Sequence, residues 1–333
     1  MEAKLVGALP TGEGWQFEPK WDGFRCLAWR AGDEVEIFAK SGNSLGRYFP
    51  EIIEALRAAP VTPFVLDGEL TIPVGETLSF EALQLRLHPA PTRIRRLASE
   101  TPALFILFDC LLDETGEDLT GAPLTCRRSA LERIFARLGR RGRFRLTPFT
   151  LEAREAQDWL DRAGGALDGV VAKRRDGPYA AGKREMLKIK RLRTADCVVG
   201  GFRYESASRL VGSLLLGLYD ETGRLNHVGF TSAIKGAERR ALTRRLEALV
   251  EPPGFTGAAP GGPSRWSNER TGEWRPLRPE LVVEVRYDHI TGRRLRHGAG
   301  LIRWRPDKAP GQCSMDQLEA EARPAALIAR AIG

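Results

Sequence analysis

Hydrophobic and polar residues alternate over short stretches in the first half of the chain, a period-of-two pattern typical of half-buried β-strands. Gly and Asn turns separate these stretches, and two longer segments, residues 49–58 and 127–138, predict helices. The expected strands are residues 25–29, 34–39, 64–72, 104–112, 167–173 and 186–190. The pattern predicts an α+β domain, with antiparallel sheets and helices, over residues 1–192.

The pattern changes after residue 193, where three strand-like runs, a helix and two more strand-like runs follow in order. The expected strands are residues 197–204, 213–219, 225–231, 281–288 and 293–303. The apolar positions of the helix recur at helical spacing, at Leu242, Leu246, Leu249 and Val250. Residues 251–267, rich in Pro and Gly, predict a loop. This order indicates a β-barrel of the OB-fold type, although other small barrels share it, so we expect an OB-fold domain with a C-terminal extension over residues 193–333.

Composition narrows the class of partner. The 333 residues are enough for two domains, and a hydrophobic content of 42% is enough for buried cores. Lys and Arg number 51 against 43 Asp and Glu, a net charge of +8 that favours a polyanion such as nucleic acid, although a membrane surface would also attract it. No apolar run reaches about 18 residues and no signal-peptide pattern opens the chain, so we expect a cytoplasmic protein with no membrane contact.

The cysteines and histidines do not indicate a disulfide framework or a zinc site. The five cysteines are odd in number and show no C-x-x-C spacing, so we expect them to be reduced. The four histidines stand in unlike sequence contexts. Any catalysis is therefore expected to use Lys, Arg and carboxylates.

The most informative segment is EPKWDGFR at residues 18–25. It sets Lys20 at the edge of an expected strand, just before a D-G turn. To act as a nucleophile the amine must lose a proton, which costs about 4.6 kcal/mol at pH 7 from an ordinary pKa of about 10.4. Neighbouring cations would lower that pKa and would also neutralise a nucleotide's phosphates. Taken alone, K-x-D-G also fits a surface lysine beside a tight turn.

Five further motifs follow this segment in order. They are LDGEL at 66–70, LFD at 107–109, LDGVVAK at 167–173, MLKIKR at 186–191 and RWRPDK at 303–308. Together the six resemble the nucleotidyltransferase motifs of the covalent superfamily that comprises ATP-dependent DNA ligases, RNA ligases and mRNA capping enzymes. The resemblance covers almost the whole chain. Within the superfamily the set looks most like the two-domain bacterial enzymes of the DNA ligase C type.

This resemblance implies catalytic and metal-binding residues. Lys20 would carry AMP, and Asp22 would be a second catalytic residue of the same motif. Glu69 and Asp168 would hold Mg²⁺ or Mn²⁺, which prefer hard carboxylate oxygens. Asp168 departs from the family, where Glu is common, and its shorter side chain would weaken or re-aim the metal contact.

The resemblance also implies the nucleotide contacts. Phe108 would stack on the adenine ring, although a core role is the plainer reading of an apolar strand. Lys188 and Lys190 alternate with apolar residues, so their side chains share one face of a strand and could reach the same phosphates. The residues expected to contact ATP are Glu18, Lys20, Arg25, Glu69, Phe108, Lys173, Lys188 and Lys190.

Further basic residues are expected to contact DNA. Arg25 and Arg47 resemble the arginines that hold the ribose or the nick 5′-phosphate, a task that suits a planar, permanently charged fork. Lys40 stands where many relatives have Arg in an S-R-N-G motif. Backbone contacts without sequence reading are expected from residues 93–96 and 137–145 and from Arg203, Arg209, Arg293, Arg294 and Arg296.

The last motif contains Arg305, Asp307 and Lys308, which lie far in sequence from Lys20. They can assist it only if the two domains close on a hinge near residues 191–195. In the family this element orients the pyrophosphate leaving group during lysine adenylation and then swings away.

The resemblance implies an ATP-dependent DNA ligase that seals nicks in duplex DNA through a lysyl-AMP and an adenylated 5′-phosphate. It further implies DNA repair and recombination in the nucleoid, with a repair polymerase or end-joining proteins as candidate partners, and we expect a monomer. Two alternatives stay open: an RNA ligase or guanylyltransferase, and a non-catalytic OB-fold protein that binds nucleic acid through its basic surface.

Overall fold

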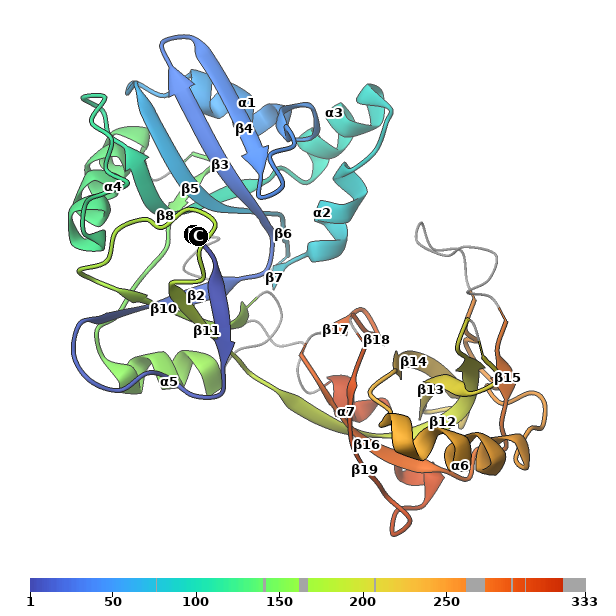
Figure 1. Ribbon diagram of the computed structural model, residues 1–333. Helices are drawn as coiled ribbons and strands as arrows, with labels where there is room; N and C mark the ends of the chain where they lie inside the picture. Colours follow the sequence, from blue (N-terminus) through green and yellow to red (C-terminus); the bar gives the residue numbers. More distant parts are fainter. Residues whose placement is uncertain are drawn as a thin grey trace. The chain divides into compact units, whose positions relative to one another are not determined.

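The structure, a computed structural model, describes residues 1–75, 77–139, 142–161, 167–206, 208–261, 273–288, 290–296 and 298–319. The chain divides into two compact units, Met1–Arg191 and a second unit that begins at Leu192 (Figure 1). Within the described residues, none of the helices combines the length and apolar character needed to cross a membrane.

Two mostly antiparallel sheets form the first unit (Figure 1). The larger sheet has the order β4-β3-β5-β8-β9, in which β9 runs parallel to β8. Its strands are β3 (Phe24–Ala31), β4 (Glu34–Ala39), β5 (Phe64–Thr71), β8 (Leu104–Leu112) and β9 (Phe144–Leu146). The smaller sheet has the order β1-β11-β10-β2, in which β1 runs parallel to β11. Its strands are β1 (Ala3–Val6), β2 (Trp15–Trp21), β10 (Leu167–Arg174) and β11 (Met186–Lys190).

Helices pack against both sheets of this unit. Ile52 of α1 and Ile134 of α4 share a buried core with Leu66 of the larger sheet. Trp159 of α5 packs with Val170 of the smaller sheet. The helices are α1 (Pro50–Arg57), α2 (Phe80–Arg86), α3 (Pro91–Glu100), α4 (Leu124–Leu138) and α5 (Ala153–Asp161), with a 3-10 turn η1 (Gly46–Tyr48) and a hairpin of β6 (Pro73–Val74) and β7 (Thr77–Leu78). Because α5 covers one face of the smaller sheet, the polar residues that alternate along its strands lie on the other face.

One antiparallel sheet, in the order β14-β13-β12-β16-β19, forms the core of the second unit, and β15 also pairs with β12. Its strands are β12 (Arg193–Tyr204), β13 (Val211–Tyr219), β14 (Leu225–Thr231), β15 (Arg275–Pro276), β16 (Val282–Tyr287) and β19 (Gly300–Trp304). The unit also contains α6 (Gly236–Glu247), η3 (Pro310–Gln312), α7 (Asp316–Glu319) and a hairpin of β17 (Ile290–Thr291) and β18 (Arg294–Leu295). Across the described ranges, no sheet closes on itself as a barrel.

The expected class, antiparallel sheets with helices, is confirmed, and the strands at 34–39, 104–112 and 186–190 agree at both ends. The single strand expected at 293–303 is wrong, because β18 and β19 are separate and pair with different strands. Helix α6 ends at Glu247, so Leu249 and Val250 lie beyond it. Several features lie outside the described residues: residues 140 and 141, His289, His297, the end of the 251–267 loop and the extension from residue 320.

A bulge in β10 sets the register next to Lys20. Leu167 pairs with Trp21 and Gly169 pairs with Lys20, so two residues of β10 oppose one step of β2. Gly169 has a φ of 141°, and a Cβ at this position would lie 2.0 Å from the carbonyl oxygen of Ile189 on β11. Only glycine fits this position without strain.

We expect Gly169→Ala to lower the free energy of unfolding by at least ~2 kcal/mol, because the backbone must shift away from a contact it cannot accommodate. Chemical denaturation measures the change. Gly121→Ala is the matched control, since a Cβ there meets no atom within 4 Å, and its effect should stay under ~1 kcal/mol. Equal effects of the two substitutions would contradict the bulge.

Candidate active site

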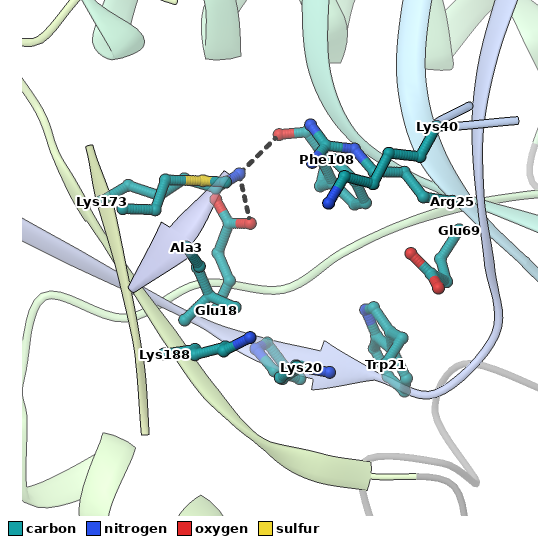
Figure 2. Close-up of a pocket in the computed structure, with 13 residues that line it drawn as sticks. Ala3, Glu18, Lys20, Trp21, Arg25, Lys40, Glu69, Phe108, Lys173 and Lys188 are labelled. Carbon is teal, nitrogen blue, oxygen red and sulfur yellow. Dashed lines mark hydrogen bonds and ion pairs between the residues drawn. The ribbon is translucent and has the colours of Figure 1, made fainter. Parts of the chain in front are cut away.

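A cavity of about 260 Å³ is lined by residues from both sheets of the first unit (Figure 2). Seven of the eight residues expected to contact ATP line it: Glu18, Lys20, Arg25, Glu69, Phe108, Lys173 and Lys188. The cavity therefore gathers side chains from motifs that are spread over about 170 residues of sequence.

Strand register explains how the smaller sheet presents its cations. Lys20 on β2, Gly169 on β10 and Lys190 on β11 are paired across the sheet. Glu18 and Lys188 stand in the next row on the same face, two residues along their strands. The sequence prediction that Lys188 and Lys190 share a face is confirmed by this register.

The Asp22-Gly23 turn carries the chain from one sheet to the other, because β2 and β3 belong to different sheets and do not pair. A Cβ on Gly23 would lie 2.2 Å from the Leu70 carbonyl oxygen and 2.8 Å from Cγ of Glu69. Glycine thus allows the close approach that sets the lysine motif beside Glu69. Trp21 secures the end of β2 with a buried hydrogen bond from its Nε1 to Thr147, at 2.9 Å.

Lys20 forms an ion pair with Asp168 inside this site. Its Nζ lies 2.6 Å from Asp168 Oδ2, and Lys190 Nζ lies 3.1 Å from the same oxygen. The Asp168 side chain is only 6% exposed, and its other oxygen, Oδ1, is buried without a hydrogen-bond partner. The carboxylate thus orients two lysines and keeps one oxygen for a further ligand.

Burial lowers the pKa of Lys188 below the ordinary lysine value, and the charges of Lys20 and Lys190 lower it further. Three amines therefore gather around one carboxylate at this end of the cavity. Such an excess of positive charge suits the phosphates of a nucleotide.

The other end of the cavity combines an aromatic face with a buried ion pair. Lys173 Nζ lies 2.7 Å from Glu18 Oε2, with both side chains less than 5% exposed. Lys173 also donates to the Phe108 carbonyl oxygen at 3.2 Å and sits 4.8 Å from the centroid of the Phe108 ring. Phe108 is only half-buried, unlike its neighbours on β8, so it is not simply a core residue.

Arg25 is held by two residues that the sequence analysis missed. Its Nε and Nη2 donate to the two oxygens of Asp67 at 3.1 and 2.6 Å, and the Tyr179 hydroxyl donates to Asp67 at 2.7 Å. The guanidinium carbon lies 5.7 Å from the centroid of the Phe108 ring. Asp67 belongs to the LDGEL motif, so the sequence offered a signal for it, whereas no local sequence pattern marks Tyr179.

Glu69 stands opposite Arg25 in the register of β5 and β3. Burial raises the pKa of its carboxyl to about 8, while the charges of Lys20 and Arg25 act in the opposite direction. Asp22 lies near enough for its charge to raise this pKa as well. Figure 2 shows the Glu69 carboxylate and the Lys20 amine directed into the same cavity.

The residues expected to contact DNA separate in the structure. Lys40 lines the cavity, although its side chain is 62% exposed and pairs with Glu2 at 3.0 Å. Arg47 is exposed on η1 with its guanidinium over the Tyr48 ring, and it does not line the cavity.

The R-x-D-K residues lie together in the second unit. Arg305 pairs with Asp307 at 2.8 Å, and both Arg305 and Lys308 pair with Asp196, at 3.0 and 2.6 Å. Sequence reasoning did not single out Asp196, which stands on β12 far from the motif.

The carboxylates could hold a metal only together with other ligands. Among the described residues, no group of three or more His, Cys, Asp or Glu is arranged to bind one. Glu69 and Asp168 nevertheless both act on Lys20, and the unpartnered Oδ1 of Asp168 fits a hard cation. A nucleotide's phosphates would supply the remaining oxygens.

Comparisons with known proteins agree with this site. Residues 5–190 match the ATP dependent DNA ligase domain, and residues 207–308 match the ATP dependent DNA ligase C terminal region. DNA ligase C2 of Mycolicibacterium smegmatis is 46% identical, over 96% of this chain and 94% of its own length. DNA ligase C of Mycobacterium tuberculosis is also 46% identical, over 96% of this chain and 93% of its own length.

A solved structure of a Lig E DNA ligase shares the fold, with a TM-score of 0.56 and 17% identity over 92% of this chain and 99% of that chain. The expected adenylation domain followed by an OB-fold domain is thereby confirmed, but the expected barrel is not seen, because β14 and β19 are the two unpaired edges of an open sheet in the described residues. The chain belongs to the family of ATP-dependent DNA ligases, and along nearly its whole length it is similar to the mycobacterial DNA ligase C enzymes.

Proposed function

We propose that Lys20 is the amine through which this DNA ligase carries AMP. The ion pair with Asp168 supports the proposal most directly, because it holds the Lys20 amine beside Lys190 in the lining of the cavity. A surface lysine beside a turn would have neither a buried partner nor neighbouring cations.

In the first step the deprotonated Nζ of Lys20 attacks the α-phosphorus of ATP. A nitrogen–phosphorus bond forms, the bond from the α-phosphorus to its bridging oxygen breaks, and pyrophosphate leaves with the electron pair. The nitrogen then gives up one more proton, which leaves a phosphoramidate. Lys188 and Lys190 would stabilise the charge that develops on the phosphates.

AMP then passes from Lys20 to the 5′-phosphate of a nick, and the freed amine takes up protons again. The 3′-hydroxyl attacks that 5′-phosphate, loses its proton and displaces AMP, which closes the phosphodiester backbone. Arg25, Lys40 and Arg47 would contact the nicked DNA, with Lys40 making a single contact in place of an arginine fork.

The apolar end of the cavity would hold the base. Phe108 would stack on adenine, Glu18 would contact its edge, and Lys173 would stay close through its pair with Glu18. Arg25, fixed by Asp67, would face the ribose. The half-buried ring of Phe108 supports this assignment.

Glu69 and Asp168 would hold Mg²⁺ or Mn²⁺ on the nucleotide phosphates. When bound, the ion would neutralise phosphate charge and favour the attack. Asp168 contributes an oxygen with no other partner, and Glu69 contributes a carboxyl whose raised pKa a bound cation would lower.

We place the adenylation domain at residues 1–192 and the OB-fold domain at 193–333. Arg305, Asp307 and Lys308 would orient the pyrophosphate leaving group when the domains close about a hinge near residues 191–195. DNA repair, a monomeric state, nucleoid association and partners such as a repair polymerase belong to the same proposal, by analogy with minimal bacterial ligases.

Lys20→Ala is expected to abolish transfer of labelled AMP from ATP to the protein, by more than ~1000-fold, because no other group takes over the nucleophile's place. Binding of nicked DNA should remain. Lys235→Ala is the control, since that side chain is 83% exposed. Sealing by Lys20→Ala would contradict the proposal, and labelling by GTP alone would favour a guanylyltransferase.

Phe108→Ala is expected to raise the KM for ATP by about 5- to 150-fold, because base stacking on an aromatic side chain contributes ~1–3 kcal/mol. Phe108→Tyr, which keeps the ring, should stay close to the wild type. The measurement is the steady-state rate of nick sealing at a series of ATP concentrations. An unchanged KM in the alanine variant would exclude stacking at this residue.

Glu69→Gln tests the raised pKa of the Glu69 carboxyl through the pH dependence of stability. In the folded protein Glu69 keeps its proton up to a pKa of about 8, and in the unfolded chain it loses it near 4.5. The folded state therefore binds more protons between these values, and wild-type stability falls as pH rises. Relative to Glu69→Gln, we expect the free energy of unfolding of the wild type to fall by roughly 1–3 kcal/mol between about pH 5 and 8. If the difference in unfolding free energy between the wild type and Glu69→Gln does not change with pH, the raised pKa of Glu69 is wrong.

A further inference from the structure

The carboxylate of Asp196 bridges the two cations of the R-x-D-K motif. Arg305 Nη1 lies 3.0 and 3.2 Å from its two oxygens, and Lys308 Nζ lies 2.6 Å from Oδ2. The Asp196 side chain is only 12% exposed, so solvent screens these contacts weakly. Asp196 thus brings two like charges together that would otherwise repel.

The backbone of Asp196 is itself fixed on both sides. It lies on β12, and its N–H donates to Gln317 Oε1 at 2.9 Å, while Gln317 Nε2 donates to its carbonyl oxygen at 3.0 Å. Arg305 directly follows β19, and its N–H donates to the Val282 carbonyl oxygen. The carboxylate therefore has a defined position relative to the motif.

Lys308 depends on Asp196 more than Arg305 does. Arg305 is also bound by Asp307 through Nε and Nη2. For Lys308, the ion pairs of the described residues include one acid, Asp196. Since a lysine side chain has many rotamers, loss of this partner would release the ammonium from its place.

The bridge leaves donors for an anion. Lys308 uses one ammonium proton on Asp196 and keeps the others, and Nη2 of Arg305 keeps one N–H beyond the one given to Asp307. Two cations that share one carboxylate and keep donors for an anion suit the two phosphate groups of pyrophosphate.

We infer that Asp196 is a positioning residue that holds Arg305 and Lys308 as one unit for the pyrophosphate leaving group. The inference rests on the proposed function of the R-x-D-K motif. Asp196 itself touches neither ATP nor DNA; it acts by fixing the two cations. Its effect is confined to the steps in which pyrophosphate leaves or returns.

Asp196→Asn in the full chain tests this inference, with three reactions measured: adenylation of Lys20 by ATP, its reversal by pyrophosphate, and sealing of a nick that already carries the 5′-adenylate. In the reversal a pyrophosphate oxygen attacks the α-phosphorus, the nitrogen–phosphorus bond breaks and the amine regains its protons. Adenylation and reversal should slow about 10- to 100-fold, with a raised KM for pyrophosphate, while sealing of the adenylated nick changes less than about twofold. Asp196→Glu, which keeps the charge, should restore part of the rate.

Glu284→Gln is the matched control. Glu284 is the register partner of Asp196 on β16, and its substitution by Gln removes the same charge as Asp196→Asn. Glu284 pairs mainly with Arg303, at 2.6 Å, and lies 3.9 Å from Arg305. It should slow adenylation less than about threefold. An equal effect of both variants would mean that net charge alone matters and would overturn the inference.

Three other results would overturn it. Faster adenylation by Asp196→Asn would make Asp196 a competitor of the anion. Loss of all three reactions together with a lower Tm would make it structural only. If Asp196→Asn adenylates at the normal rate while Lys308→Ala is slow, the positioning role of Asp196 is wrong but the proposed role of the motif stands. If Lys308→Ala adenylates at the normal rate, the proposed role of the motif is wrong.

Discussion

The ion pair between Lys20 and Asp168 is the contact on which the rest of the site depends. It exists because a bulge at Gly169 shifts the register of β10 against β2. The same carboxylate also takes Lys190 from β11, so one acid orders amines from two strands. Without the bulge, regular alternation would turn Asp168 away from the face that carries these amines.

The two sheets of the first unit contribute different kinds of side chain to the cavity. The smaller sheet supplies most of the amines, and the larger sheet supplies Phe108, Glu69 and Arg25. The Asp22-Gly23 turn carries the chain directly from β2 of the smaller sheet to β3 of the larger sheet, so the lysine motif lies at a junction of the two. The buried pair of Glu18 and Lys173 is costly to desolvate and contributes little to stability by itself, which is consistent with a role in binding rather than in folding.

The hydrophobic pattern of the sequence predicted those features of the fold that depend on neighbouring residues alone. Alternation gave the strands at 34–39 and 186–190 and placed Lys188 and Lys190 on one face. Alternation could not predict the bulge in β10, the ion pair of Asp67 with Arg25, or the contacts of Asp196 with the R-x-D-K motif. These features depend on strand register and on contacts between distant segments. The single strand predicted at 293–303 was wrong because hydrophobic alternation continues across the residues that separate β18 from β19.

The central claim is that one amine, held by Asp168, forms the covalent bond to AMP. Its most direct test is peptide mapping by mass spectrometry of the wild-type protein after incubation with ATP and Mg²⁺, with digestion at neutral pH to preserve the phosphoramidate. The expected result is AMP on the peptide that contains Lys20 and on no other. AMP on Lys188 or Lys190, or a protein that never acquires AMP, would contradict the account.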